Sequence, residues 1–205
     1  MIKRFSIVCL GDSLTVGYQS YSVLGSNNGT PYNFHLETMV RTYINSNGIS
    51  VNAVIINKGI NGDSTDGMIS RLPSILTIEK PNLLILWAGI NDLSAGRKPH
   101  DIIKNIAEIV RLCTNKQVST VICGLTPVAG PTHLNEMIRE LNELIYGFCE
   151  AQKIIYVDTY EPLSGKEGGL DPANSNDGVH LSNRGYRIVS EKVYESIKPI
   201  LESLK

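Results

Sequence analysis

The sequence predicts an α/β protein in which helices cover both faces of a five-stranded parallel sheet, a three-layer α/β/α arrangement. Five short segments are mostly continuous apolar runs, which suits strands that are covered on both faces. Segments with apolar residues at helical spacing separate them, and this alternation favours a parallel sheet with right-handed crossovers. The predicted strands are residues 5–10, 51–56, 83–87, 118–123 and 154–157.

The first two helices are predicted from their ends. Thr30 is suited to cap a helix that has Pro31 in its first position, and the Asn-Gly pair at residues 47–48 predicts where this helix stops. A shorter helix is expected around residues 66–72, immediately before Pro73.

Three longer apolar stripes predict the remaining helices. Ser182 is suited to cap the last of them, which runs towards Leu204. The inner faces of these helices are formed by Ile102, Ile103, Ile106, Ile109, Val110 and Cys113, by Leu134, Met137, Ile138, Leu141, Leu144, Ile145, Phe148 and Cys149, and by Ile188, Val189, Val193, Ile197 and Leu201.

Length and composition limit the classes of function. A chain of 205 residues without repeats or linkers favours one domain over residues 1–205, and 42% hydrophobic with 19% charged residues is ordinary for a globular protein. A net charge of −1 gives no reason to expect a nucleic acid or an anionic membrane as a partner. No apolar run approaches the roughly 20 residues of a transmembrane segment.

The N-terminus has some features of a signal peptide. Lys3 and Arg4 before an apolar run resemble a signal peptide, but the run has six residues, against about 7–15 in a signal sequence, and no small-residue cleavage site follows. We therefore expect a strand there and a cytoplasmic protein.

The four cysteines lack metal-ligand spacing and lie in apolar runs, so buried free thiols are expected. Cys123 ends a predicted strand.

Polar and glycine-rich segments follow the predicted strands, and in a parallel sheet they gather at the edge where ligands bind. The first contains Gly11, Asp12 and Ser13, three residues that favour turns, so Ser13 is expected on an exposed loop. The segments are residues 11–17, 57–65, 88–92, 124–130 and 158–180.

An esterase-type serine needs a base, a group that holds the base, and donors for the oxyanion. His180 can take the proton of Ser13, and Asp177, three residues earlier in a tight turn, can hold the imidazole. The N–H groups of Ser13 and Gly62 and the side-chain amide of Asn91 can serve as donors. The other histidines, His35, His100 and His133, occur in or beside helices or in a polar stretch and are weaker candidates for the base.

Together these motifs closely resemble the GDSL, or SGNH, hydrolase superfamily. Ser13 within Gly-Asp-Ser-Leu, Gly62 within Asn-x-Gly-x-x-Gly, Asn91 within Gly-x-Asn-Asp, and Asp177 with His180 in Asp-x-x-His match its four blocks in order. The resemblance implies a flavodoxin-like sheet, ester hydrolysis through an acyl-enzyme, and no metal or other cofactor. The Gly-x-Ser-x-Gly nucleophile elbow of the α/β-hydrolases is absent.

The substrate is less well defined. Residues 17–29 are rich in Tyr, Ser, Gly and Asn and form either a wall of the site, with Tyr18 and Tyr21 as contacts, or an ordinary surface connection. Val128 is expected to line an acyl pocket, and Asp12 is a further candidate contact. The sequence has no large apolar insertion of the kind that forms a lipase lid. We therefore expect a small-molecule substrate, namely a short-chain and soluble ester.

Other functions remain open. An acyltransferase, a thioesterase or a lysophospholipase would use the same site, and an adaptor protein would keep a vestigial one. A flavin- or phosphate-binding module would use the hydroxyls of Ser13 and Thr15. That hypothesis leaves Asn91, Asp177 and His180 unexplained, and a yellow purified protein would favour it.

Overall fold

The computed structural model describes residues 3–19, 30–130 and 132–205. Its sheet has five parallel strands in the order β2-β1-β3-β4-β5. The strands are β1 (Lys3–Gly11), β2 (Val51–Gly59), β3 (Leu83–Trp87), β4 (Ser119–Cys123) and β5 (Ile155–Val157). The predicted fold class is confirmed, and this strand order is the flavodoxin-like one.

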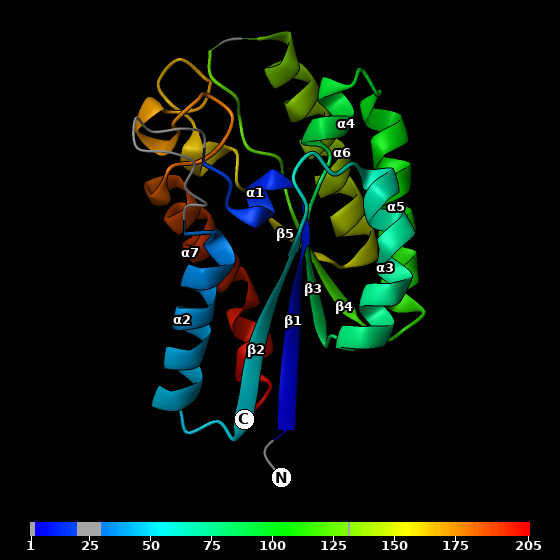
Figure 1. Ribbon diagram of the computed structural model, residues 1–205, viewed down its shortest axis with the longest axis vertical. Helices are drawn as coiled ribbons and strands as arrows, with labels where there is room; N and C mark the ends of the chain where they lie inside the picture. Colours follow the sequence, from blue (N-terminus) through cyan, green and yellow to red (C-terminus); the bar gives the residue numbers. More distant parts are fainter. Residues whose placement is uncertain (1–2, 20–29, 131) are drawn as a thin grey trace.

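Helices cover the sheet on both faces. In Figure 1, α2 and α7 lie on one side of the sheet, and α3, α5 and α6 lie on the other. The helices are α1 (Ser13–Val16), α2 (Tyr32–Ser46), α3 (Thr65–Glu79), α4 (Ile90–Ser94), α5 (Pro99–Thr114), α6 (His133–Gln152) and α7 (Asn183–Glu202), with short 3₁₀ turns η1 (Glu161–Leu163) and η2 (Pro172–Asn174).

The core consists of two apolar layers separated by the sheet. Along β1, Ile7 and Cys9 pack in the layer that contains α2 and α7, whereas Val8 and Leu10 pack in the layer that contains α3, α5 and α6. Burial on both faces explains why the strands read as continuous apolar runs. Each such side chain contributes about 1.5–3 kcal/mol by leaving water.

Helix α3 differs from the prediction. It runs through Pro73 to Glu79, so the prediction that it stops before this proline is wrong. Pro73 removes the hydrogen bond to the carbonyl of Ile69, but Pro73 is exposed, where water can satisfy that carbonyl. Burial of Leu72 and Ile75 on the inner face keeps the helix continuous.

Two predicted helix starts had different outcomes. Pro31 is extended, with φ −66° and ψ 158°, and takes the cap position itself, so Thr30 does not cap α2 and Tyr32 is its first residue. The Ser182 cap of α7 is confirmed, because its hydroxyl accepts a hydrogen bond from the Gly185 N–H at 3.3 Å.

All four cysteines are buried with free thiols, as the sequence predicts. Cys123 is fully buried at the end of β4, and burial raises the pKa of its thiol well above the ordinary value. In the described part of the chain, no helix has the length and apolar character that crossing a membrane requires.

Candidate active site

Three strands end in register at one edge of the sheet. Gly11 pairs with Gly59 of β2 on one side and with Trp87 of β3 on the other. The residues that follow these strands therefore start side by side, although they are far apart in the sequence. In Figure 1 the orange segment between β5 and α7 lies beside α1 at this same end.

Ser13 is the first residue of α1, directly after β1, and is buried, so the prediction that it lies on an exposed loop is wrong. The Asp12 carboxylate caps the helix by accepting the Leu14 N–H at 2.9 Å. No carbonyl among the described residues accepts the N–H of Ser13, which leaves it available. A Cβ atom on Gly59 would lie 2.5 Å from the Val16 nitrogen, so glycine is what allows β2 to approach α1 so closely.

The predicted nucleophile, base and acid lie together. The Ser13 hydroxyl is 3.1 Å from Nε2 of His180, and Nδ1 of the same ring is 2.7 Å from the Asp177 carboxylate. Because a carboxylate only accepts, Nδ1 carries the proton in this contact, and Nε2 is free to accept from Ser13. Asp177 also accepts the N–H groups of Val179 and His180, at 2.9 and 2.7 Å.

The charge of Asp177 follows from these contacts. Burial raises the pKa of this carboxyl, but the hydrogen bonds from His180 and Val179 outweigh burial and hold the pKa below its ordinary value. Asp177 is therefore ionised at neutral pH, which suits a group that orients an imidazole and stabilises its positive form.

A tight turn holds the acid and the base. Gly178 has φ +85° and donates its N–H to the Ser175 hydroxyl at 2.8 Å. The same hydroxyl donates to the His180 carbonyl at 2.7 Å. The Gly178 carbonyl accepts the Ala129 N–H at 2.7 Å, so the segment after β4 supports this turn.

The two remaining predicted oxyanion donors come from the segments after β2 and β3. Gly62 has φ +72° in a turn that the Asp63 N–H closes onto the Ile60 carbonyl at 3.1 Å. Among the described residues, no carbonyl accepts the Gly62 N–H. The Asn91 amide donates to the Asp63 carbonyl at 3.0 Å, and its second N–H remains for a ligand.

A polar network that the sequence reasoning missed supports these donors. Asp92 is buried and accepts the Thr65 N–H and hydroxyl at 2.9 and 2.6 Å, which links the segments after β2 and β3. Arg71 of α3 contacts Asp63 and the Gly11 carbonyl. Its signal in the sequence is that it is the one basic residue between positions 65 and 79.

The predicted substrate contacts have different surroundings. The Tyr18 ring packs edge-on against the His180 ring, with centroids 4.5 Å apart. Asp12 is buried as the helix cap, and Val128 is buried in the core beside α6. Tyr21 lies outside the described residues. Contacts of these four residues with a substrate stay predictions.

Residues 3–19, 30–130 and 132–205 contain no cluster of side chains that suits a metal ion. In these ranges, no three His, Cys, Asp or Glu side chains gather where they could hold an ion. The contacts of Ser13 with His180 and of His180 with Asp177 instead suit nucleophilic catalysis, and the segments that carry Gly62 and Asn91 follow the two strands that pair with β1.

Comparisons of the sequence show the family. The pattern that describes the GDSL-like Lipase/Acylhydrolase family matches residues 9–188. Esterase TesA of Pseudomonas aeruginosa is 29% identical over 150 residues, which cover 72% of this chain and 71% of TesA. An arylesterase of Vibrio mimicus is 28% identical over 116 residues, covering 57% of this chain and 52% of that enzyme. The human platelet-activating factor acetylhydrolase IB subunit alpha2 is 25% identical over 152 residues, covering 72% and 66%.

Solved structures share the fold. A putative lipolytic protein of the G-D-S-L family from Desulfitobacterium hafniense has a TM-score of 0.77 at 18% identity, over 93% of this chain and 98% of that one. The aryl esterase of M. smegmatis has a TM-score of 0.75 at 18% identity, over 95% and 99%. The chain therefore belongs to the GDSL-like lipase/acylhydrolase family and is an ester-cleaving hydrolase of the GDSL type.

Proposed function

We propose that this protein hydrolyses carboxylic esters through an acyl-enzyme formed on Ser13. The observation that carries the proposal is the continuous contact from Ser13 to His180 at 3.1 Å and from His180 to Asp177 at 2.7 Å. This is the relation between nucleophile, base and orienting acid that covalent acyl transfer requires.

Acylation starts when the Ser13 oxygen attacks the ester carbonyl and its proton moves to Nε2 of His180. The ionised Asp177 stabilises the imidazolium that forms. The negative charge moves onto the former carbonyl oxygen, where the Ser13 and Gly62 N–H groups and the Asn91 amide donate to it. His180 then gives its proton to the leaving alcohol oxygen as the ester C–O bond breaks.

Deacylation repeats these steps with water as the nucleophile. His180 takes a proton from the water as its oxygen attacks the acyl carbonyl, and the same donors hold the second oxyanion. The proton returns to the Ser13 oxygen as the acid leaves, which restores the free enzyme.

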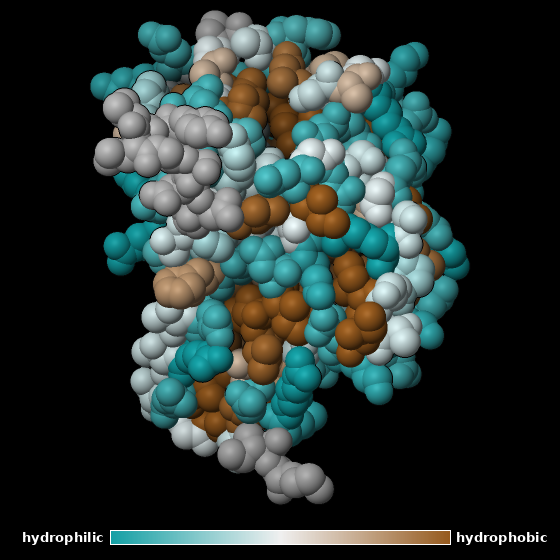
Figure 2. Space-filling model, in the orientation of Figure 1, coloured by the Kyte–Doolittle hydropathy of each residue, from teal (hydrophilic) through white to brown (hydrophobic). Residues whose placement is uncertain are grey.

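Small or soluble esters are the proposed substrates. Two of the exposed large hydrophobic residues stand at the site: Ile60 in the oxyanion turn, 50% exposed, and Val179 between the acid and the base, 38% exposed. Figure 2 shows hydrophobic side chains in several patches on this face, one of them at the upper end, toward which β1 and β2 point. Two relatives are named an esterase and an arylesterase, which supports an ester substrate, and a third is named an acetylhydrolase, which supports a small acyl group.

The test is hydrolysis of p-nitrophenyl esters from acetate to palmitate by the wild type and by Ser13→Ala and His180→Ala. We expect activity to fall with chain length in the wild type and to drop by about 10⁴-fold or more in both variants. His133→Ala is the matched control, because His133 is exposed and pairs with Glu136 on α6. Undiminished activity of Ser13→Ala would overturn the mechanism.

Product analysis, substrate preference and active-site labelling separate the alternatives. Ester products formed with an added alcohol would indicate an acyltransferase, and preference for a thioester or a lysophospholipid would redefine the substrate. A phosphonate that labels Ser13 in the wild type argues against a vestigial adaptor. A single domain over residues 1–205 and a cytoplasmic location stay predictions from the sequence.

A further inference from the structure

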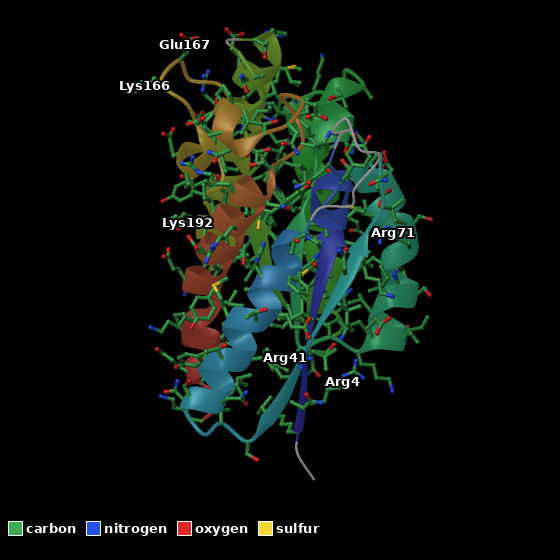
Figure 3. All side chains as sticks on the ribbon, turned by 60° about the vertical axis from the view of Figure 1, so that its left-hand side comes forward. Arg4, Arg41, Arg71, Lys166, Glu167 and Lys192 are labelled. Atoms are coloured by element: carbon green, nitrogen blue, oxygen red, sulfur yellow. The ribbon has the colours of Figure 1, made fainter. Side chains whose placement is uncertain are left out.

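Arg71 is a cation held beside the oxyanion donors. Its Nε donates to the Asp63 carboxylate at 2.8 Å, and Nη2 lies 2.7 Å from the same oxygen. Nη2 also donates to the Gly11 carbonyl at 3.1 Å. The two side chains are only 20% and 10% exposed, so solvent screens this ion pair little. Figure 3 labels Arg71 beside the upper end of β1, on the side where α3 lies.

Each partner of Arg71 is connected to a proposed oxyanion donor. Gly11 precedes Ser13 by two residues, and its carbonyl also accepts the Ile60 N–H at 3.1 Å, from the turn that presents Gly62. Asp63 follows Gly62 directly, and its carbonyl accepts the Asn91 amide. One guanidinium therefore joins the segments that carry Ser13 and Gly62, and the second of these segments holds the Asn91 amide through the Asp63 carbonyl.

The charge of Asp63 would oppose catalysis if it were unpaired. This carboxylate belongs to the residue next to Gly62, so it lies close to the place where a second negative charge develops in the transition state. A hydrogen-bonded guanidinium neutralises it at short range. Gly67 leaves the space for the Asp63 carboxylate, because a Cβ atom there would overlap its oxygen.

We propose that Arg71 is a positioning residue for ester hydrolysis, which aligns the three oxyanion donors and neutralises the carboxylate of Asp63. It does not touch the reacting atoms itself. The proposal rests on the function proposed above, because it assigns a role to Arg71 only if an oxyanion forms between Ser13, Gly62 and Asn91.

The role predicts a loss of kcat with little change in KM. We expect Arg71→Met to lower kcat by about 10- to 100-fold, because misplaced donors stabilise the transition state less than the bound ester. A trifluoromethyl ketone, which forms an anionic adduct with an active-site serine, should bind more weakly by a similar factor. Arg111→Met is the matched control, since Arg111 makes an exposed ion pair with Glu108 on α5.

Removing both charges separates the electrostatic role from a purely structural one. We expect Arg71→Met/Asp63→Asn to recover part of the kcat lost in Arg71→Met, because the unpaired carboxylate is gone. Arg71→Lys should lie between the wild type and Arg71→Met, because it keeps the charge but not the two-sided contact. Titration with a phosphonate counts active sites, so misfolded protein does not enter kcat.

Two results would overturn this role and leave the proposed function intact. One is Arg71→Met with unchanged kcat while Ser13→Ala is inactive. The other is a double variant no more active per titrated site than Arg71→Met, with ketone affinity unchanged in both. Undiminished activity of Ser13→Ala would instead overturn the proposed function itself.

Discussion

Ser13 lies at a buried junction of three paired strand ends, whereas His180 lies in a partly exposed segment that joins β5 to α7. The nucleophile is placed by the pairing of Gly11 with Gly59 and Trp87, which is part of the core. The base is placed by a local turn, by Ser175 and by one contact to Ala129. The segment before the base contains only short 3₁₀ turns and isolated bridges as regular structure.

This difference separates catalysis from stability. A change at the strand ends disturbs packed backbone and therefore affects both the folded state and the reaction. A change in the acid–base turn mainly alters the direction in which an imidazole points. The following variants test that distinction, in order of expected effect.

Asp177→Asn should have the largest effect on the reaction. An asparagine keeps the shape of the turn but cannot stabilise the imidazolium, so we expect kcat to fall by about 10⁴-fold. The free energy of unfolding should change by only about 1 kcal/mol, because the side chain is partly exposed and its contacts are local. Steady-state kinetics and urea unfolding measure the two effects, and a fall in kcat below tenfold would contradict this role.

Gly59→Ala should damage stability and activity together. The new Cβ atom would meet backbone atoms of Val16, Asp12 and Thr15 at 2.5–2.9 Å, so α1 must move. We expect a loss of about 1–3 kcal/mol in unfolding free energy and a clear fall in kcat, because α1 carries Ser13.

Gly147→Ala provides the matched control for Gly59→Ala. Gly147 lies in α6, where a Cβ atom would meet nothing within 4 Å. Alanine there should raise stability by about 0.5–1 kcal/mol through helix propensity and leave kcat unchanged. Equal stability of Gly59→Ala and the wild type would show that β2 and α1 are not packed this tightly.

These contrasts also explain what the sequence could predict. Continuous apolar runs located all five strands. β1 and β3 are buried on both faces, whereas the edge strands β2 and β5 are mostly half-buried. The apolar runs did not indicate that β2 continues through Asn57 and Lys58 to Gly59, since that extension depends on pairing with β1. The continuation of α3 past Pro73 likewise depends on packing, which local proline chemistry does not contain.

Some residues of the site could likewise be predicted from the sequence, and others could not. Ser13, Asp177 and His180 occur in short motifs whose chemistry is visible in the residues themselves, and the structure brings them within hydrogen-bond distance. The contact of Arg71 with Asp63 and Gly11 depends on how α3 is rotated against the sheet. No local pattern reports that rotation, so this support was not predicted.

Gly178→Ala should affect the acid–base turn moderately. Alanine is strained at φ +85°, and its Cβ atom would lie 2.7 Å from that of Ala129. We expect a loss of about 1–3 kcal/mol and a fall in kcat, because His180 follows two residues later. Ala129→Gly in the same chain should restore part of the kcat, since it removes the contact but not the strain.

Gly48→Ala isolates the strain in that experiment. Gly48 has φ +62° at the end of α2, with no atom within 4 Å of a new Cβ. Its variant should lose stability by about 1 kcal/mol and keep kcat. A Gly178→Ala enzyme with wild-type kcat would mean that the turn does not position His180.

Asp12→Asn should have the smallest effect, and one that depends on pH. Burial, with the nearby charges of Asp63 and Asp92, raises the pKa of Asp12 to about 7 in the folded state, against an ordinary value of 3.8. A raised carboxyl pKa means that the folded state keeps the proton up to a higher pH than the unfolded state does. Its stabilising contribution is complete below pH 3.8 and is lost as the pH rises through about 7.

The size of this loss follows from the same pKa. Between pH 6 and pH 8 the folded state gives up close to one proton that the unfolded state has already lost. The free energy of unfolding should therefore fall by about 1.4 kcal/mol more in the wild type than in Asp12→Asn, which keeps a capping side chain but cannot ionise. Urea unfolding of both proteins at the two pH values measures the difference. If the unfolding free energies of the two proteins changed in parallel with pH, Asp12 would ionise freely in the folded state. The nucleophile end of the site would then be less enclosed than the burial of its strand ends indicates.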